Sequence, residues 1–152
     1  QSVAVGLARE LAEMMRANAQ EAGKATSNPY LGAFSGSPLQ PATTSTCLAV
    51  GSTCNTAADV ANAQMTDWLA RVSAELPDAR VTVCFDGAPF DTDGLPQWTC
   101  NATGADEIVY IKIGWTRAGT DRSQTGSAAL ERASDTGSRP YVIFPVTGGN
   151  AL

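Results

Sequence analysis

Four cysteines are the residues of this sequence with the clearest chemical capability, because a thiol can form a disulfide or bind a metal. They are Cys47, Cys54, Cys84 and Cys100. No two of them form a C-x-x-C motif, so their spacing argues against a zinc ribbon and against a thioredoxin-type redox site. An even number of cysteines in a chain rich in Ser, Thr and Gly favours two disulfides and an oxidising compartment. Four reduced, buried thiols are the alternative.

The spacing of these cysteines leaves three disulfide connectivities open. Loop entropy stabilises the fold by about 2.5 kcal/mol for a Cys47–Cys54 bridge and by about 3 kcal/mol for a Cys84–Cys100 bridge. Nested long-range pairs gain somewhat more, so entropy does not choose among the connectivities. We favour the two local pairs because each lies within one loop or one hairpin.

A cluster of aspartates is the second group that could do chemistry. Asp91-x-Asp93-Gly94, close to Asp86, matches the start of a calcium-binding loop. An EF-hand needs a glutamate at the twelfth position, where this sequence has Ala102, so only a looser oxygen-ligand site for calcium is left. Asx-type turns in a strand connection are the simpler interpretation, and we predict no metal site.

The residues needed for common catalytic mechanisms are missing. The chain contains no histidine, which is the commonest general base and metal ligand, so Ser-His-Asp and Cys-His catalysis are excluded. Asp59 and Asp67 are better suited to a helix cap and a surface charge than to an acid/base pair. No glycine-rich phosphate loop is present. We therefore predict no catalytic residue, no cofactor and no enzymatic activity.

Composition limits the partners and the size of the fold. The net charge is −5, and the 10 Lys and Arg residues form no cluster. Nucleic acids and anionic membrane surfaces are recognised by clustered basic residues, so we predict that the chain binds neither. A length of 152 residues with 43% hydrophobic content fits one globular domain, which we predict over residues 1–152.

An amphipathic helix is predicted over residues 1–20. Its apolar residues recur at steps of three and four, which places them on one stripe. They are Val3, Leu7, Leu11, Met14 and Met15. Glu13 is spaced for helix-surface ion pairs with Arg9 and Arg16. Because no cap residue precedes this helix, we expect it to be the back half of a longer one.

A loop rich in Ser, Thr, Gly and Pro is predicted over residues 24–56. We expect four apolar side chains to anchor it on the core: Tyr30, Leu31, Phe34 and Leu39. A mobile linker is the alternative. A loop of this length in a compact domain often serves function or docking.

A second helix is predicted over residues 57–76. Thr56-x-x-Asp59 resembles a capping box at its start, and Pro77 ends it. Its predicted buried stripe consists of Ala61, Met65, Trp68, Leu69, Val72 and Leu76. We expect Trp68 to be the core anchor of this helix.

An antiparallel sheet of three to four strands is predicted over residues 79–146, where the apolar period becomes two. The predicted strands are 80–85, 97–101, 107–116 and 139–146. Val109, Ile111, Ile113 and Trp115 share the core-facing side of the third strand. Pro140 and Pro145 indicate that the last strand is an edge. Residues 120–138 are predicted to be a polar insertion with a helical turn at 128–130.

The order of these elements, helices first and strands afterwards, indicates the α+β class. Three stretches in this order also resemble the minor pilins of type IV pili, in particular those of the PilV type. The first is GLARELAEMMRAN at residues 6–18. The second runs from Cys54 through Asp67-Trp68 to Leu76-Pro77, and the third is IVYIKIGWTR at residues 108–117. Together they cover about half of the chain.

The resemblance implies a pilin-like fold and a structural function. The protein would be held in the inner membrane of a Gram-negative bacterium by an upstream helix segment, face the periplasm, and then enter the extracellular pilus. It would act in the priming complex at the tip, in pilus assembly, twitching motility and adhesion. The implied partners are other minor pilins, the major pilin and a tip adhesin.

Other functions stay open at this point. A minor pseudopilin of a type II secretion system is built in the same way. An exported ligand- or calcium-binding module that uses Asp91 and Asp93 belongs to another class. An exported hydrolase with a pair of carboxylates is the weakest alternative.

Overall fold

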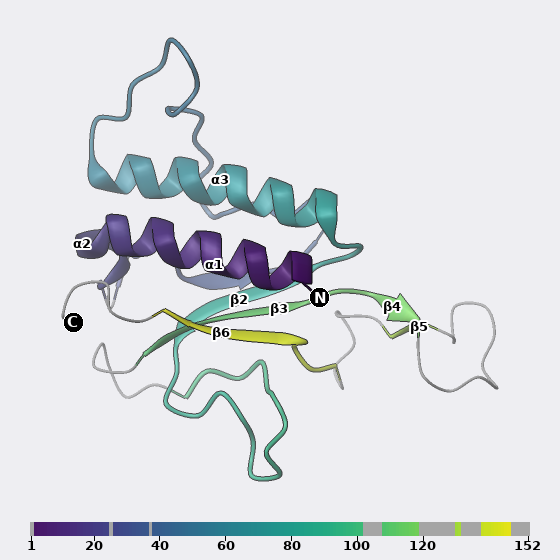
Figure 1. Cartoon of the computed structure of the whole chain (residues 1–152). Helices are drawn as coiled ribbons and strands as arrows, with labels where there is room; N and C mark the ends of the chain where they lie inside the picture. The colour runs from purple at the N-terminus through teal and green to yellow at the C-terminus, as the bar shows by residue number, and fades with distance from the viewer. Residues whose placement is uncertain are drawn as a thin grey trace.

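The computed structural model of the protein describes residues 2–24, 26–36, 38–101, 108–118, 130–131 and 138–146. Two long helices, α1 (Ser2–Ala17) and α3 (Ala57–Glu75), lie on one face of a four-stranded antiparallel sheet (Figure 1). The strand order is β1 (Gly32–Phe34), β2 (Arg80–Phe85), β3 (Val109–Gly114) and β6 (Val142–Val146). The prediction of an α+β chain with an N-terminal helix and an antiparallel sheet is therefore confirmed.

Helix α1 lies over β3 and β6 (Figure 1). Its buried residues are Ala4, Leu7, Ala8, Leu11, Ala12 and Met15. The prediction that Val3 belongs to the buried stripe is wrong, since Val3 is 46% exposed, and Met14 is only partly buried. The buried stripe includes Ala4, Ala8 and Ala12 in place of Val3 and Met14. The small alanine side chains let the helix backbone approach the sheet closely.

Helix α1 ends earlier than predicted, at Ala17. The N–H of Asn18 donates to the carbonyls of Met14 and Met15, both at 3.2 Å. A single turn, α2 (Ala19–Ala22), follows and is closed by Gly23. The side chain of Asn28 then donates to the carbonyl oxygen of Ala22 at 2.9 Å, which satisfies an acceptor that the helix end leaves free.

The loop after α2 packs on the core through the predicted anchors. Tyr30, Phe34 and Leu39 are buried, and Leu31 is partly buried. The hydroxyl of Tyr30 donates to Gln64 on α3 at 2.5 Å. Strand β1 was not predicted, because a three-residue strand between polar segments produces no periodic pattern. It pairs with β2 and makes the second edge of the sheet.

Helix α3 has the predicted buried stripe, including Trp68, which is fully buried. The hydroxyl oxygen of Thr56 accepts the N–H of Asp59 at 3.0 Å, as a capping residue does. The Asp59 carboxylate accepts the N–H of Asn55 instead of completing the box at Thr56. The indole N–H of Trp68 donates to the carbonyl of Leu7 at 2.8 Å and joins the two long helices.

The core side of the sheet is apolar from strand to strand. Val81 and Val83 of β2 stand opposite Ile113 and Ile111 of β3, and all four are fully buried. Trp115 follows the end of β3 and is only partly buried. Strand β6 is an edge, as predicted.

Two predicted elements of this half are wrong where the structure describes them. Residues 97–101 do not form a strand. The predicted helical turn at 128–130 begins outside the described residues, and its last residue, Leu130, belongs to β5 (Leu130–Glu131). This strand pairs with β4 (Arg117–Ala118) instead.

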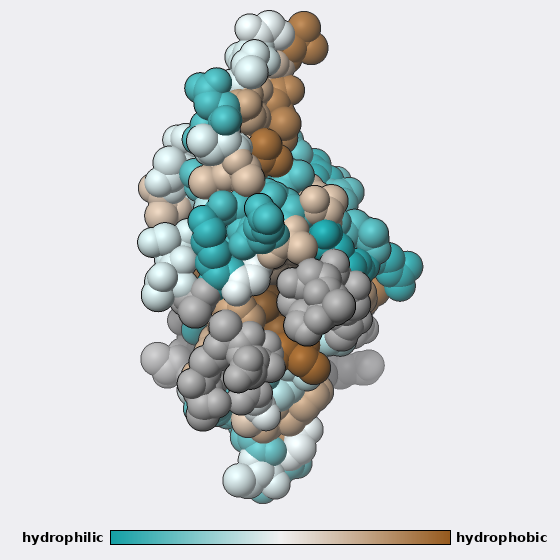
Figure 2. All heavy atoms as spheres, turned by 90° about the vertical axis from the view of Figure 1, so that its left-hand side faces the viewer, coloured by the Kyte–Doolittle hydropathy of each residue, from teal (hydrophilic) through white to brown (hydrophobic). Residues whose placement is uncertain are grey.

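Both favoured disulfides, Cys47–Cys54 and Cys84–Cys100, are present, with S–S distances of 1.93 and 2.00 Å. The loop that Cys47–Cys54 closes projects above α3 (Figure 1). Leu48 and Val50 within it are exposed, and hydrophobic residues gather on this projection (Figure 2). Among the described helices, none combines the length and apolar character needed to cross a bilayer.

Candidate functional site

The polar centre of the protein lies on the face of the sheet that the helices do not cover. Lys112, in the middle of β3, is fully buried there. Its ammonium group donates to the Asp86 carboxylate at 2.5 Å and to the carbonyls of Gln97 and Thr99 at 2.8 and 2.9 Å. These bonds explain why residues 97–101 are not a strand, because the carbonyls of Gln97, Trp98 and Thr99 face the ammonium group rather than another strand.

Asp86 compensates the positive charge of the buried Lys112 side chain. It is 1% exposed, and its second carboxylate oxygen accepts the N–H groups of Ala88 at 2.8 Å and Asn101 at 3.1 Å. The Cys84–Cys100 disulfide closes the same segment from the other side. Residues 86–101 are therefore fixed over β3 by an ion pair, hydrogen bonds and a covalent bond, and form a loop below the sheet (Figure 1).

These contacts set the ionisation of Asp86. Burial alone would raise the pKa of its carboxyl, but the hydrogen bond from Lys112 and the N–H groups of Ala88 and Asn101 outweigh burial, and the pKa is lowered from 3.8. At any pH at which the Asp86 carboxyl of the unfolded chain is ionised, the carboxyl of the folded chain is therefore ionised too.

The lowered pKa of Asp86 predicts a loss of stability in acid. Its contribution is fully present above 3.8, the value of the free side chain, and disappears as the pH falls through the lower pKa of the folded state. We expect the unfolding free energy, measured with denaturant from pH 6 to pH 2, to fall more steeply in this window for the native chain than for Asp86→Asn. Equal slopes would contradict the assignment.

The aspartate loop that suggested calcium is a hydrogen-bonded turn. One oxygen of Asp91 accepts the N–H groups of Asp93 at 2.9 Å and Leu95 at 3.0 Å, and the other accepts from Arg139 at 2.7 Å. Gly94 supplies the positive φ of 80° that the turn requires. These contacts favour the predicted Asx turn, because both Asp91 oxygens already have donors.

The fold brings together only some of the cysteines and aspartates that the sequence singled out. Among the described residues, Cys84, Asp86 and Cys100 form a cluster of possible metal ligands, but its two sulfurs are joined in the disulfide. The Asp59 carboxylate accepts the N–H of Asn55 at 3.3 Å in the first turn of α3, and Asp67 pairs with Arg71 at 3.0 Å, so the two carboxylates do not form an acid/base pair.

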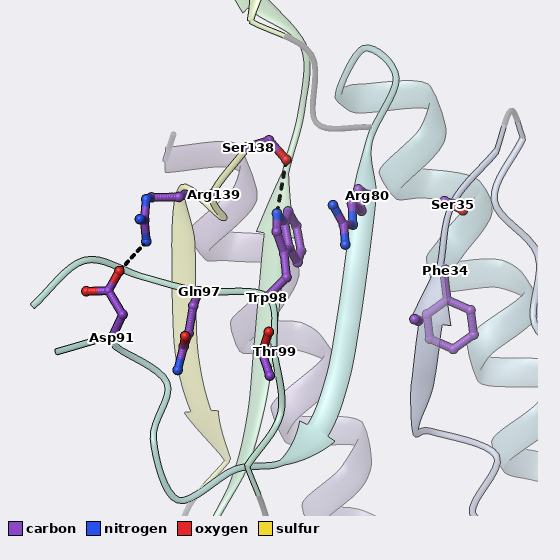
Figure 3. Close-up of a pocket in the computed structure, with 10 residues that line it drawn as sticks. Phe34, Ser35, Arg80, Asp91, Gln97, Trp98, Thr99, Ser138 and Arg139 are labelled. Carbon is purple, nitrogen blue, oxygen red and sulfur yellow. Dashed lines mark hydrogen bonds and ion pairs between the residues drawn. The ribbon is translucent and has the colours of Figure 1, made fainter. Parts of the chain in front are cut away.

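A groove lies beside residues 86–101, with a volume of about 640 Å³. Arg80, Trp98 and Arg139 line it (Figure 3). The Arg80 guanidinium carbon lies 4.2 Å from the centre of the Trp98 ring, and the indole N–H donates to Ser138 at 3.2 Å. Sequence reasoning did not identify this groove. The one available signal was Lys112, a charged residue inside an apolar strand, which indicates a buried polar partner.

A second surface lies at the projecting disulfide loop. A depression of about 640 Å³ beneath it is lined by Met14, Leu48, Ala49, Ala63 and Ala70, among others. Leu48 is 57% exposed, and Val50 at the tip is fully exposed. Exposed apolar residues rimmed by polar ones are typical of contact sites between proteins.

No protein-family model matches the sequence, and neither the curated proteins nor the solved structures include one that is significantly similar to it.

Proposed function

We propose that the chain is a minor pilin of the PilV type, a structural subunit in the tip priming complex of a type IV pilus. It works there in pilus assembly, twitching motility and adhesion, with other minor pilins, the major pilin and a tip adhesin as partners. Its route is from the inner membrane and periplasm of a Gram-negative bacterium to the extracellular fibre.

The observation that carries the proposal is the way α1 is placed. One face of this N-terminal helix covers β3 and β6, while its other face stays accessible, with Val3, Arg9 and Glu13 exposed. Glu10 and Glu13 form ion pairs with Arg71 and Arg16, so part of this surface charge is used within the chain. A helix held in this way can pack against neighbouring subunits without losing its own core.

The disulfide loop supplies a second argument for assembly. Leu48 and Val50 are exposed on a loop whose shape is fixed by Cys47–Cys54. Fixing a loop before binding lowers the entropy lost when it is buried against a partner. Disulfides also fit an exported protein.

Two alternatives share parts of this support. The first is a minor pseudopilin of a type II secretion system, which we expect to be built in the same way. Neighbouring genes and the location of the protein in the cell distinguish it from a pilin. A calcium-binding module is disfavoured by the hydrogen bonds that both Asp91 oxygens already accept.

Gene deletion tests the proposed function. In the bacterium that encodes the chain, deletion is expected to reduce surface fibres and twitching, and the native gene is expected to restore both. We expect complementation with Arg9→Glu to restore piliation poorly, because the reversed charge lies on the exposed face of α1. Fibres are counted by electron microscopy, and thermal melting checks that the variant is folded.

Glu75→Arg is the matched control, since it reverses an exposed charge at the end of α3. It is expected to restore piliation as the native gene does. Normal piliation and twitching in the deletion strain would count against the assembly role. The proposal also requires an apolar segment of about 20 residues upstream of Ser2 in the encoded protein, and a conventional cleavable signal peptide there would contradict it.

A further inference from the structure

We propose that the groove beside residues 86–101 binds carboxylate-bearing sugar units of an acidic polysaccharide. This activity goes beyond the structural role proposed above, and it stands on a different part of the molecule. The argument uses the charge of the groove, its indole ring, its hydroxyl groups and the rigidity of its wall.

The groove has a positively charged lining in an acidic protein. Among the described residues that line it, Arg80 and Arg139 contribute two guanidinium groups and Asp91 contributes one carboxylate, whereas the whole chain has a net charge of −5. Arginine is well suited to a carboxylate, because its planar fork can donate two parallel hydrogen bonds. The groove therefore favours an anionic ligand, whereas the acidic remainder of the surface would attract cations.

Arg139 is positioned for this task. Its Nη1 atom donates to Asp91 at 2.7 Å and to the carbonyl of Pro96 at 2.9 Å. Among the described residues, the Nε and Nη2 groups of Arg139 have no acceptor, and its side chain is 42% exposed. The internal bonds orient the guanidinium, and its remaining donors are available to a ligand.

The rest of the lining suits a sugar better than a simple carboxylic acid. Trp98 stands between Arg80 and Arg139 in the view of Figure 3, and an indole ring offers an apolar surface to the C–H groups of a pyranose. Beside the apolar Ala33 and Phe34, three hydroxyl side chains and one amide also line the groove: Ser35, Thr99, Ser138 and Gln97. Such groups exchange hydrogen bonds with sugar hydroxyls.

The groove is also large enough and rigid enough for this ligand. Its volume of about 640 Å³ lies within the ordinary range of small-molecule sites. Its wall is fixed by Lys112, which bonds to the carbonyls of Gln97 and Thr99, and by the Cys84–Cys100 disulfide. A fixed wall lowers the entropy cost of binding. The buried ion pair thus gives the groove its shape.

Calorimetric titration with trigalacturonate, in a buffer that contains a chelator, tests the inference. Binding is expected for trigalacturonate and not for maltotriose, a neutral α-1,4-linked trisaccharide of the same length. We expect Arg80→Gln and Arg139→Gln each to weaken binding about tenfold, the loss of one charge-assisted contact. Salt at about 0.5 M is expected to weaken it as well, because the contact is electrostatic.

Arg117→Gln is the matched control. Arg117 also lies over an aromatic ring, 4.1 Å from the centre of Tyr141, but does not line the groove. Its substitution is expected to leave affinity unchanged. Thr99→Asp adds a negative charge at an exposed position of the groove and is expected to weaken binding even if an arginine variant misfolds.

The inference is overturned if the native chain does not bind trigalacturonate, or if maltotriose binds equally well. Tighter binding of triglutamate would assign the groove to an acidic peptide instead. Affinity that is unchanged in both Arg80→Gln and Thr99→Asp would place the ligand elsewhere. None of these results depends on piliation, so the inference and the proposed function can fail separately.

Discussion

Replacement of Asp86 by alanine is expected to lower the unfolding free energy by about 3–5 kcal/mol. The substitution leaves the ammonium group of Lys112 buried without its carboxylate, and it also removes the acceptor for the N–H groups of Ala88 and Asn101. A buried charge that loses its partner bears a large desolvation penalty, which is why the expected loss exceeds that of a surface ion pair. Denaturant unfolding at pH 7 measures it.

Asp93→Ala is the control for this prediction. Asp93 is an exposed aspartate of the same loop, and its loss is expected to change stability by no more than about 0.5 kcal/mol. Replacing Asp86 and Lys112 together by alanine and methionine is expected to recover part of the loss, because no unpaired charge remains. If Asp86→Ala costs less than about 1 kcal/mol, the ion pair does not support residues 86–101 as described.

The second large effect is expected in the helical layer. Trp68→Ala removes a fully buried indole and its hydrogen bond to the Leu7 carbonyl. Deleting a buried aromatic side chain costs about 3–5 kcal/mol, since the cavity closes only partly. Because Trp68 joins α1 to α3, the loss is also expected to make α1 more accessible to hydrogen exchange.

Two substitutions frame the Trp68 result. Trp68→Phe keeps most of the buried ring but cannot donate a hydrogen bond to the Leu7 carbonyl. Its unfolding free energy is therefore expected to lie between those of the native chain and Trp68→Ala. Leu48 is 57% exposed, so Leu48→Ala is expected to leave the unfolding free energy almost unchanged. A Trp68→Ala chain as stable as Leu48→Ala would show that the two helices do not depend on this contact.

The elements with a clear period were predictable from sequence. The apolar stripe of α3 and the alternation of β2 and β3 reappear in the structure, because one buried face imposes the period of the element. Local disulfides were also favoured correctly. Val3 was misplaced because a hydropathy pattern weights valine above alanine, whereas the packing of α1 on the sheet favours alanines.

The candidate groove could not be predicted in the same way. Arg80, Trp98 and Arg139 come from three separate segments, and only the tertiary fold places them together. The segment with Trp98 resembled a strand, but the buried ammonium group of Lys112 takes its carbonyls. A charged side chain that is distant in the sequence can bind the carbonyls of such a segment and prevent strand pairing. No periodic pattern in the sequence reveals this.

The assembly proposal and the groove use opposite sides of the sheet. The helices α1 and α3 lie on one face, and residues 86–101 lie on the other (Figure 1). A subunit that packs through α1 would therefore keep the groove accessible. In this proposal, one subunit combines a role in the fibre with contact to an acidic surface polymer.

The most direct test of the central claim is to find where the protein is in the cell. Pili sheared from the bacterium and purified are expected to contain this chain at a low ratio to the major pilin, detected by mass spectrometry and by immunogold labelling of the fibres. Its absence from the sheared fibres, with the protein found free in the periplasm or in the medium, would contradict the account.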